Sequence, residues 1–221
     1  MTQAVTDFVR EKLGHATKDS ALFERALTHS SSSPESYERL EFLGDRVLGL
    51  IVARALYERY PNEPEGSLSR RYNALVARDT CAEVGRTLGL PALIRLGKQA
   101  RSDGASRSDN VVGDVVEALI GALLLDGGMA QAQRFVLDAW QGYLAGQGRA
   151  PQHPKSALQE LAAARGRKPP VYETVSRTGA HHLPRFAVSV SIPGLGEATA
   201  EGSSKQEAET AAAAALLAQL T

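Results

Sequence analysis

Residues 37–56 read YERLEFLGDRVLGLIVARAL, and residues 110–128 read NVVGDVVEALIGALLLDGG. Both stretches space their apolar residues three and four apart, which predicts helices. Between Val111 and Leu125 the second stretch is apolar or glycine except at Asp114 and Glu117. A helix that is apolar nearly all round is a buried helix. The second helix is therefore expected to lie in the core and to carry two carboxylates there.

The first helix carries three acids on one stripe, because Glu38, Glu41 and Asp45 follow one another at spacings of three and four. One interpretation is that the stripe is the solvated face of an amphipathic helix, with apolar residues such as Leu40 and Leu50 on the other side. Glu41 and Asp45 are, however, a like-charge pair with no basic residue three or four positions away, and such pairs mildly destabilise a helix. A functional acidic stripe is the alternative interpretation.

The acids of the second helix need a partner, because an unpaired carboxylate in an apolar environment would rather take up a proton. An arginine from elsewhere could supply a buried ion pair, or a metal ion could bind. If the two acidic stripes pack together, cations must lie between them. Mg²⁺ prefers carboxylate and water oxygens and is commonly completed by a substrate phosphate, whereas the sequence has no cluster of His and Cys that would suggest zinc.

A group of carboxylates around Mg²⁺ is suited to phosphodiester cleavage. One ion can lower the pKa of a water molecule that then attacks phosphorus, while a second stabilises the leaving oxygen. No histidine is required as a general acid or base. The acidic helices therefore indicate a metal-dependent hydrolase of phosphodiesters.

The segments around these acids resemble the ribonuclease III family. ERLEFLGD at 38–45 resembles the family signature, and GDVVEALIGALLLDGG at 113–128 resembles its second block. ALTHSS at 26–31 and EGSLSRRYNALV at 65–76 match as well, so the resemblance spans nearly the whole helical part. It implies an all-α endonuclease domain over residues 1–148.

The resemblance also implies roles for individual residues. Glu41, Asp45, Asp114 and Glu117 would hold Mg²⁺, for which Mn²⁺ would substitute, and Asp45, Glu117 and Glu38 would serve catalysis. The protein would be a homodimer with Phe42 at the interface. Cleavage of double-stranded RNA would leave 5′-phosphates and two-nucleotide 3′ overhangs, in ribosomal and other precursor RNAs. Arg46 departs from the family pattern, which more often has a small residue there.

The residues after about 148 change character. The segment GQGRAPQHPK predicts a connector, placed at residues 149–154, because Gly, Pro and polar residues there cannot hold a helix. A helix near 155–165, three strands near 170–177, 185–192 and 195–201, and a helix from Ser204 to Leu220 are expected beyond it. This small α+β domain, residues 155–221, has the order α-β-β-β-α.

The C-terminal segments resemble a double-stranded-RNA-binding domain, a module that recognises the shape of A-form RNA. The matching segments are HPKSALQELAAARG at 153–166, GAHHLPRF at 179–186 and GSSKQEAETAAA at 202–213. The resemblance implies that RNA is bound by six residues: Ser156, Gln159, Glu160, His182, Ser204 and Lys205. His182 could also be an ordinary loop histidine.

Two departures in this domain predict weaker RNA affinity. Gln206 stands where the module usually has a second lysine, and Ala200 where a glycine is common. Residues 151–221 carry seven Lys plus Arg against six Asp plus Glu, so this part contributes little positive charge. Since RNA affinity depends strongly on phosphate contacts from basic side chains, we expect a modest affinity.

The bulk composition excludes several classes of protein. With 43% hydrophobic and 23% charged residues the chain is typical of a globular protein, and no apolar run approaches the roughly 18 residues of a membrane span. A cytoplasmic protein without a small-molecule cofactor is expected. The zero net charge gives no support to nucleic-acid binding.

Two other functions are alternatives to cleavage of double-stranded RNA. The first is a non-cleaving RNA-binding protein, but such a protein has no reason to keep five mutually repelling acids. The second is a nuclease that cuts DNA, which the RNA-type module disfavours.

Overall fold

The computed structural model describes residues 2–146, 153–179 and 184–220. The chain divides into two compact units, Met1–Pro151 and Gln152–Thr221, each with its own hydrophobic core. The first unit is helical and the second combines helices with a sheet, which confirms the predicted fold class. Most of the expected connector, 149–154, lies outside the described residues, so its limits stay a prediction.

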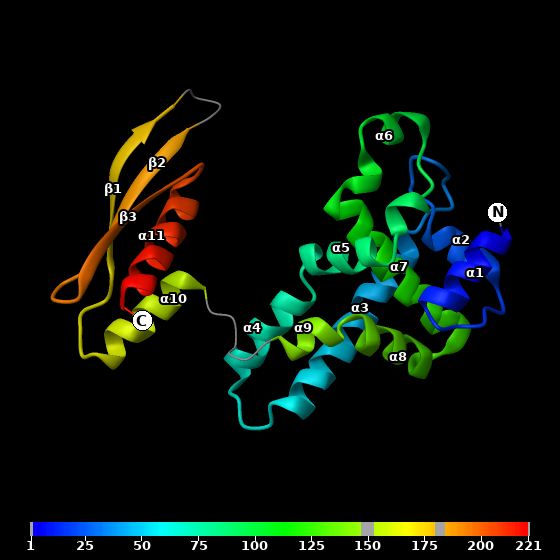
Figure 1. Ribbon diagram of the computed structural model, residues 1–221, viewed down its shortest axis with the longest axis horizontal. Helices are drawn as coiled ribbons and strands as arrows, with labels where there is room; N and C mark the ends of the chain where they lie inside the picture. Colours follow the sequence, from blue (N-terminus) through cyan, green and yellow to red (C-terminus); the bar gives the residue numbers. More distant parts are fainter. Residues whose placement is uncertain (1, 147–152, 180–183, 221) are drawn as a thin grey trace. The chain divides into compact units, whose positions relative to one another are not determined.

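The first unit is built from α-helices and short 3-10 turns (Figure 1). The α-helices are α1 (Thr2–Lys12), α2 (Ser20–Ala26), α3 (Glu38–Arg59), α4 (Glu65–Leu75), α5 (Arg78–Thr87), α6 (Lys98–Ser102), α7 (Asp109–Gly127), α8 (Met129–Ala139) and α9 (Gln141–Ala145). The turns are η1 (Leu90–Ala92) and η2 (Ala105–Arg107). Among the described helices, none is long and apolar enough to cross a membrane.

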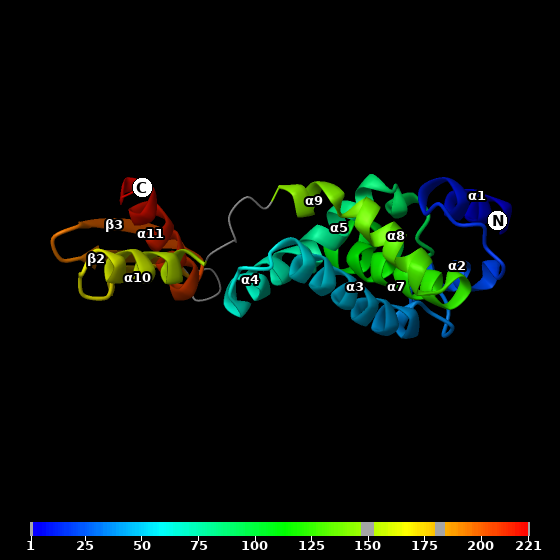
Figure 2. The ribbon, with the colours of Figure 1, turned by 90° about the horizontal axis from the view of Figure 1, so that it is seen from below.

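Helix α7 is the centre of this unit and is buried over most of its length. Helix α3 lies along it, as Figure 2 shows. Two glycines let the backbones touch. A Cβ at Gly44 would lie 1.7 Å from the carbonyl oxygen of Glu117, and one at Gly121 would lie 2.3 Å from that of Leu40. Any side chain at either position would push the two helices apart, and with them the acids that they carry.

One buried carboxylate near the end of α7 forms hydrogen bonds with the segment between α1 and α2. Asp126 accepts hydrogen bonds from the backbone N–H groups of Lys18 and Asp19, both at 2.9 Å. Its Oδ2 also lies 2.6 Å from Nε2 of His15, and both side chains are buried. These contacts hold the helix that carries Asp114 and Glu117 at a fixed position in the core.

The second unit has the expected order, with α10 (Pro154–Ala164), β1 (Val171–Thr178), β2 (Arg185–Ile192), β3 (Gly196–Gly202) and α11 (Lys205–Leu220). The strands form one antiparallel sheet in the order β1-β2-β3. Both helices pack on one face of that sheet, where Leu158 of α10 and Leu216 of α11 meet Val190 and Ile192 of β2. Figure 1 shows this two-layer arrangement.

Candidate active site

Three acids from the two central helices meet at one point. Glu41 of α3 and Asp114 and Glu117 of α7 each offer a carboxylate oxygen, and these three oxygens lie within 4.8 Å of one another. They line a pocket of about 240 Å³, here called the acid pocket, which is completed by Asp45, Val76, Arg78 and Gly113. The expected juxtaposition of the two acidic stripes is therefore present.

The other two predicted acids lie outside this group of three carboxylate oxygens. Asp45 lines the acid pocket, yet its carboxylate is paired with the guanidinium of the adjacent Arg46. The same guanidinium lies 5.0 Å from the ring centre of Phe42. Glu38 is exposed and lines a different hollow, although its charge is among the causes that raise the pKa of Glu41. The roles of Asp45 as a ligand and Glu38 as an assisting residue stay predictions.

The acid pocket holds partly buried carboxylates close together, and burial is the largest cause of their raised pKa values. Burial, followed by the negative charges of Glu41 and Asp114, raises the pKa of Glu117 to about 7, against smaller lowering effects of the charges of Arg78 and Arg46. Burial likewise raises the pKa of Glu41 and of Asp114. Such a group binds a proton more readily than ordinary carboxylates do.

A tyrosine orients one of these acids. The hydroxyl of Tyr37 donates a hydrogen bond of 3.2 Å to Oδ2 of Asp114. The tyrosine is buried at the start of α3, and its ring meets the ring of His29 edge-on at 5.7 Å. Burial together with the charge of Asp114 raises the pKa of Tyr37, so its hydroxyl keeps its proton and remains a donor. One oxygen of Asp114 is thus fixed by a defined partner.

These residues fit a divalent cation. The donor set is made of carboxylate oxygens alone, as Mg²⁺ and Mn²⁺ prefer, and the oxygens are close enough to share an ion. A bound cation would also remove the mutual repulsion that raises the pKa of Glu117. Because ligands must lose their protons to bind a metal, the affinity should increase with pH.

The stability of the metal-free protein should depend on pH through Glu117. The folded-state pKa of this group is raised from 4.5 to about 7, so its contribution to the free energy of unfolding is present below about pH 4.5 and lost as the pH rises through 7. The raised pKa values of Glu41 and Asp114 act in the same direction. The shift of Glu117 corresponds to at most about 3 kcal/mol, which solvent screening reduces.

Urea denaturation with a chelator, at a series of pH values, measures this loss. Glu117→Gln should flatten the decline, and Mg²⁺ should stabilise the wild type more at high pH than at low pH. If wild type and Glu117→Gln show the same pH dependence, the description of the acid pocket is wrong.

Comparisons with known proteins place this geometry in a family. The family profile described as ribonuclease-III-like matches residues 19–141, which include the whole acid pocket. Ribonuclease 3 of Zymomonas mobilis is 59% identical over 214 residues, covering 97% of this chain and 87% of the relative. Ribonuclease 3 of Caulobacter vibrioides is 46% identical over 221 residues, covering 97% and 95%. The chain belongs to the ribonuclease III family.

Solved structures of the family agree with the fold. The nuclease domain of ribonuclease III from Campylobacter jejuni has a TM-score of 0.60 and 32% identity, covering 62% of this chain and 96% of that one. The Campylobacter domain shows structural flexibility in a region involved in its dimer formation. A second profile, the double-stranded RNA binding motif, matches residues 154–220. Both modules of a ribonuclease III are therefore present.

The C-terminal module exposes most of the residues expected to bind RNA. Ser156, Gln159 and Glu160 are exposed along one face of α10, at spacings of three and four. Ser204 and Lys205 are exposed at the start of α11, where the Ser204 hydroxyl accepts a hydrogen bond of 3.1 Å from the N–H of Glu207. His182 lies outside the described residues. Their contact with RNA stays a prediction.

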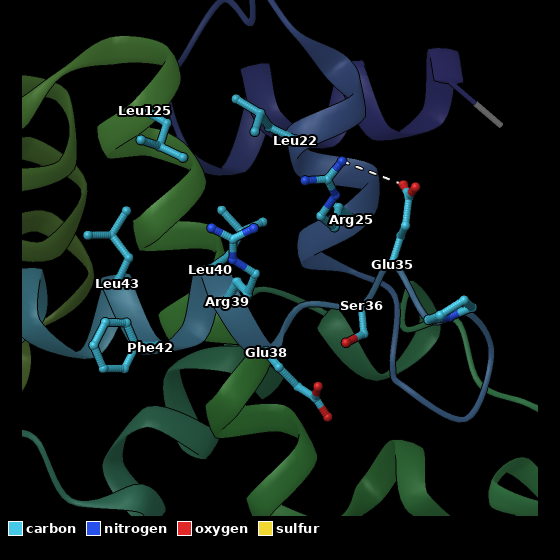
Figure 3. Close-up of a pocket in the computed structure, with 11 residues that line it drawn as sticks. Leu22, Arg25, Glu35, Ser36, Glu38, Arg39, Leu40, Phe42, Leu43 and Leu125 are labelled. Atoms are coloured by element: carbon cyan, nitrogen blue, oxygen red, sulfur yellow. Dashed lines mark ion pairs between the residues drawn. The ribbon is translucent and has the colours of Figure 1, made fainter.

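A second surface feature of the ribonuclease III domain lies beside the start of α3. A hollow of about 970 Å³, here called the apolar hollow, is lined by Leu22, Arg25, Pro34, Glu35, Ser36, Glu38, Arg39, Leu40, Phe42, Leu43 and Leu125. Figure 3 shows leucines from α2, α3 and α7 converging on it, with the ion pair of Arg25 and Glu35 at one side. Phe42, at the rim, is 65% exposed. A large aromatic side chain so exposed beside an apolar hollow is typical of an interaction site.

Sequence reasoning missed several residues of this site. Gly44 and Gly121 stand three and four positions after Glu41 and Glu117, so their place on the acidic faces was a signal that the helices touch there. Tyr37 gave no such signal, because its partner is 77 residues away. Arg78 could not be assigned either, since it enters the acid pocket from α5.

Proposed function

We propose that this protein is an endoribonuclease that hydrolyses phosphodiester bonds of double-stranded RNA with Mg²⁺ as its cofactor. The observation that carries the proposal is the meeting of Glu41, Asp114 and Glu117 within 4.8 Å, on a ribonuclease III scaffold joined to an RNA-binding module. A non-cleaving protein would be under no physical requirement to hold three repelling carboxylates together.

Glu41, Asp114 and Glu117 would hold the cation, and Asp45 would join them once its carboxylate leaves Arg46. Divalent ions supply a water of lowered pKa and stabilise negative charge on phosphate oxygens. In the reaction the oxygen of water bonds to phosphorus and the bond to the 3′ oxygen breaks, which leaves a 5′-phosphate and a 3′-hydroxyl. Mn²⁺ would substitute for Mg²⁺.

The chain's own contribution is to fix the acids before the substrate arrives. Gly44 and Gly121 allow the backbones of α3 and α7 to approach closely, and Tyr37 donates a hydrogen bond to one oxygen of Asp114. Groups that are already in place when charge develops need no reorganisation during the reaction. This preorganisation is what the buried hydroxyl of Tyr37 and the two glycines provide.

The protein would act as a homodimer. Phe42 projects beside the apolar hollow on the same face, and a two-fold axis brings the same patch of both subunits together. Each Phe42 could then enter the hollow of the partner subunit. Two acid pockets in one dimer would serve the two strands of a duplex, giving products with two-nucleotide 3′ overhangs.

The cellular role proposed is the maturation of ribosomal and other precursor RNAs in the cytoplasm. The RNA-binding module reads the shape of the duplex rather than its sequence. Duplex segments of precursors are therefore suitable substrates, whereas DNA duplexes lack the A-form grooves and the 2′-hydroxyls.

Labelled duplex RNA, duplex DNA and single-stranded RNA, each incubated with Mg²⁺ or with a chelator, test the proposal directly. We expect cleavage of duplex RNA alone, and only with the metal. Products separated on a denaturing gel should carry 5′-phosphates. Binding of duplex RNA without cleavage under all conditions would instead establish a non-cleaving RNA-binding protein, and cleavage of DNA would refute the proposed substrate.

A further inference from the structure

Arg78 is the basic residue that lines the acid pocket within the described part of the chain. It is the first residue of α5, preceded by Ala77, and its side chain is exposed. It therefore enters the pocket from a third helix, separate from the two that carry the acids. A guanidinium at this place carries a fixed positive charge, since arginine keeps its proton in proteins.

A hydrogen bond holds Arg78 against α7. Its Nη1 donates to Oδ1 of Asn110 at 3.0 Å, and Asn110 stands one helical turn before Asp114. Among the described residues, the guanidinium makes no ion pair within 4.0 Å. Its remaining N–H groups are therefore not used by the acids of the pocket.

The contrast with Arg71 shows that Arg78 is not a simple counterion. Arg71 is buried and donates two hydrogen bonds to Glu63, at 2.8 and 2.6 Å, as a structural ion pair does. Arg78 instead stays outside contact distance, although its charge lowers the pKa of Glu41, Asp114 and Glu117 against the larger effect of burial. Arg78 therefore acts on the three acids through its charge but forms no ion pair with them. Its guanidinium is free to bind another anionic group, such as a ligand in the pocket.

The substrate would bring the charge that such an arginine can bind. Divalent ions would offset the carboxylates that hold them, while a phosphodiester adds its own negative charge, which grows as water bonds to phosphorus. The planar guanidinium presents parallel N–H groups that match phosphate oxygens.

We propose that Arg78 binds a non-bridging oxygen of the scissile phosphate and stabilises the charge that develops on it. The inference rests on the proposed function and adds a catalytic residue that comes from α5. Asn110 is then a positioning residue, because it acts by holding the guanidinium over the pocket.

The test compares Arg78→Ala and Arg78→Lys with Arg134→Ala, which removes an exposed arginine of α8 that does not line the pocket. Two quantities are measured: the single-turnover rate of duplex RNA cleavage at saturating protein and Mg²⁺, and the affinity of the RNA-free protein for Mn²⁺. Arg78→Ala should lower the rate by about a hundredfold, the usual effect of losing one donor to developing charge. Arg78→Lys should recover part of the rate, and Arg134→Ala should leave it unchanged.

The affinity for Mn²⁺ separates this role from a structural one. Removing a positive charge beside the acids should leave Mn²⁺ binding unchanged or tighten it. If Mn²⁺ binding weakens as much as cleavage, Arg78 shapes the metal site and the inference fails. A rate for Arg78→Ala within about threefold of wild type would also overturn it, since a lost phosphate contact costs more than that. If the wild type itself does not cut duplex RNA, the proposed function fails instead.

Discussion

Replacing Glu117 by Gln is expected to lower the cleavage of duplex RNA by about a thousandfold, at the upper end of what losing one charged group in a preorganised site costs. The amide has the size of the carboxylate but not its charge, so it cannot neutralise a cation shared with Glu41 and Asp114. Duplex binding should stay close to the wild-type value, because RNA affinity depends on the C-terminal module. Cleavage assays and a gel-shift titration in Ca²⁺ measure the two properties separately.

Two controls complete this prediction. Glu11→Gln removes an exposed carboxylate of α1, far in sequence from the acid pocket, and should change neither property. Glu117→Gln should be at least as stable as the wild type at about pH 8 in chelator, since it removes a half-buried negative charge. Equal losses of cleavage and binding would show that the role of Glu117 is not chemical.

Replacing Phe42 by Glu is expected to convert the dimer into monomers and to lower cleavage with it. Phe42 is 65% exposed in the isolated chain and stands beside the apolar hollow, so burying a charge there on association is strongly unfavourable. A central aromatic residue contributes about 2 kcal/mol or more to an interface. The dimer dissociation constant should therefore rise by at least about twentyfold, and by more where the charge is fully buried, since about 1.4 kcal/mol is tenfold.

Sedimentation equilibrium measures the association, with Val175→Glu as the matched control. Val175 is a similarly exposed apolar residue, at 62%, but lies in the C-terminal unit. The substitution Val175→Glu should leave the dimer intact. A dimer of unchanged affinity in Phe42→Glu would mean that the apolar hollow serves another partner.

Much of this site follows from local patterns in the sequence. The buried helix with Asp114 and Glu117 was predictable, because its apolar run leaves no solvated face for the two acids. The alternation of strands and turns after residue 170 likewise predicts the sheet, and the observed β1, β2 and β3 confirm it. These features depend on periodicity within one element, which a sequence displays directly.

The rest depends on contacts that periodicity does not display. Helical spacing identifies neighbours three and four positions away. It therefore does not predict the ion pair between Asp45 and the adjacent Arg46. The pattern also does not show that Leu50, expected on the apolar side of α3, is 59% exposed. The hydrogen bond from Tyr37 to Asp114 and the position of Arg78 arise only when α3, α5 and α7 pack together.

The whole account depends on one claim, that the acids of the pocket bind a shared divalent cation. Crystals grown with Mn²⁺, studied at the manganese absorption edge, test it most directly. We predict an anomalous peak in the acid pocket, about 2.0–2.6 Å from oxygens of Glu41, Asp114 and Glu117, with Asp45 released from Arg46. Crystals that contain Mn²⁺ at other sites but no peak between α3 and α7 would contradict the account.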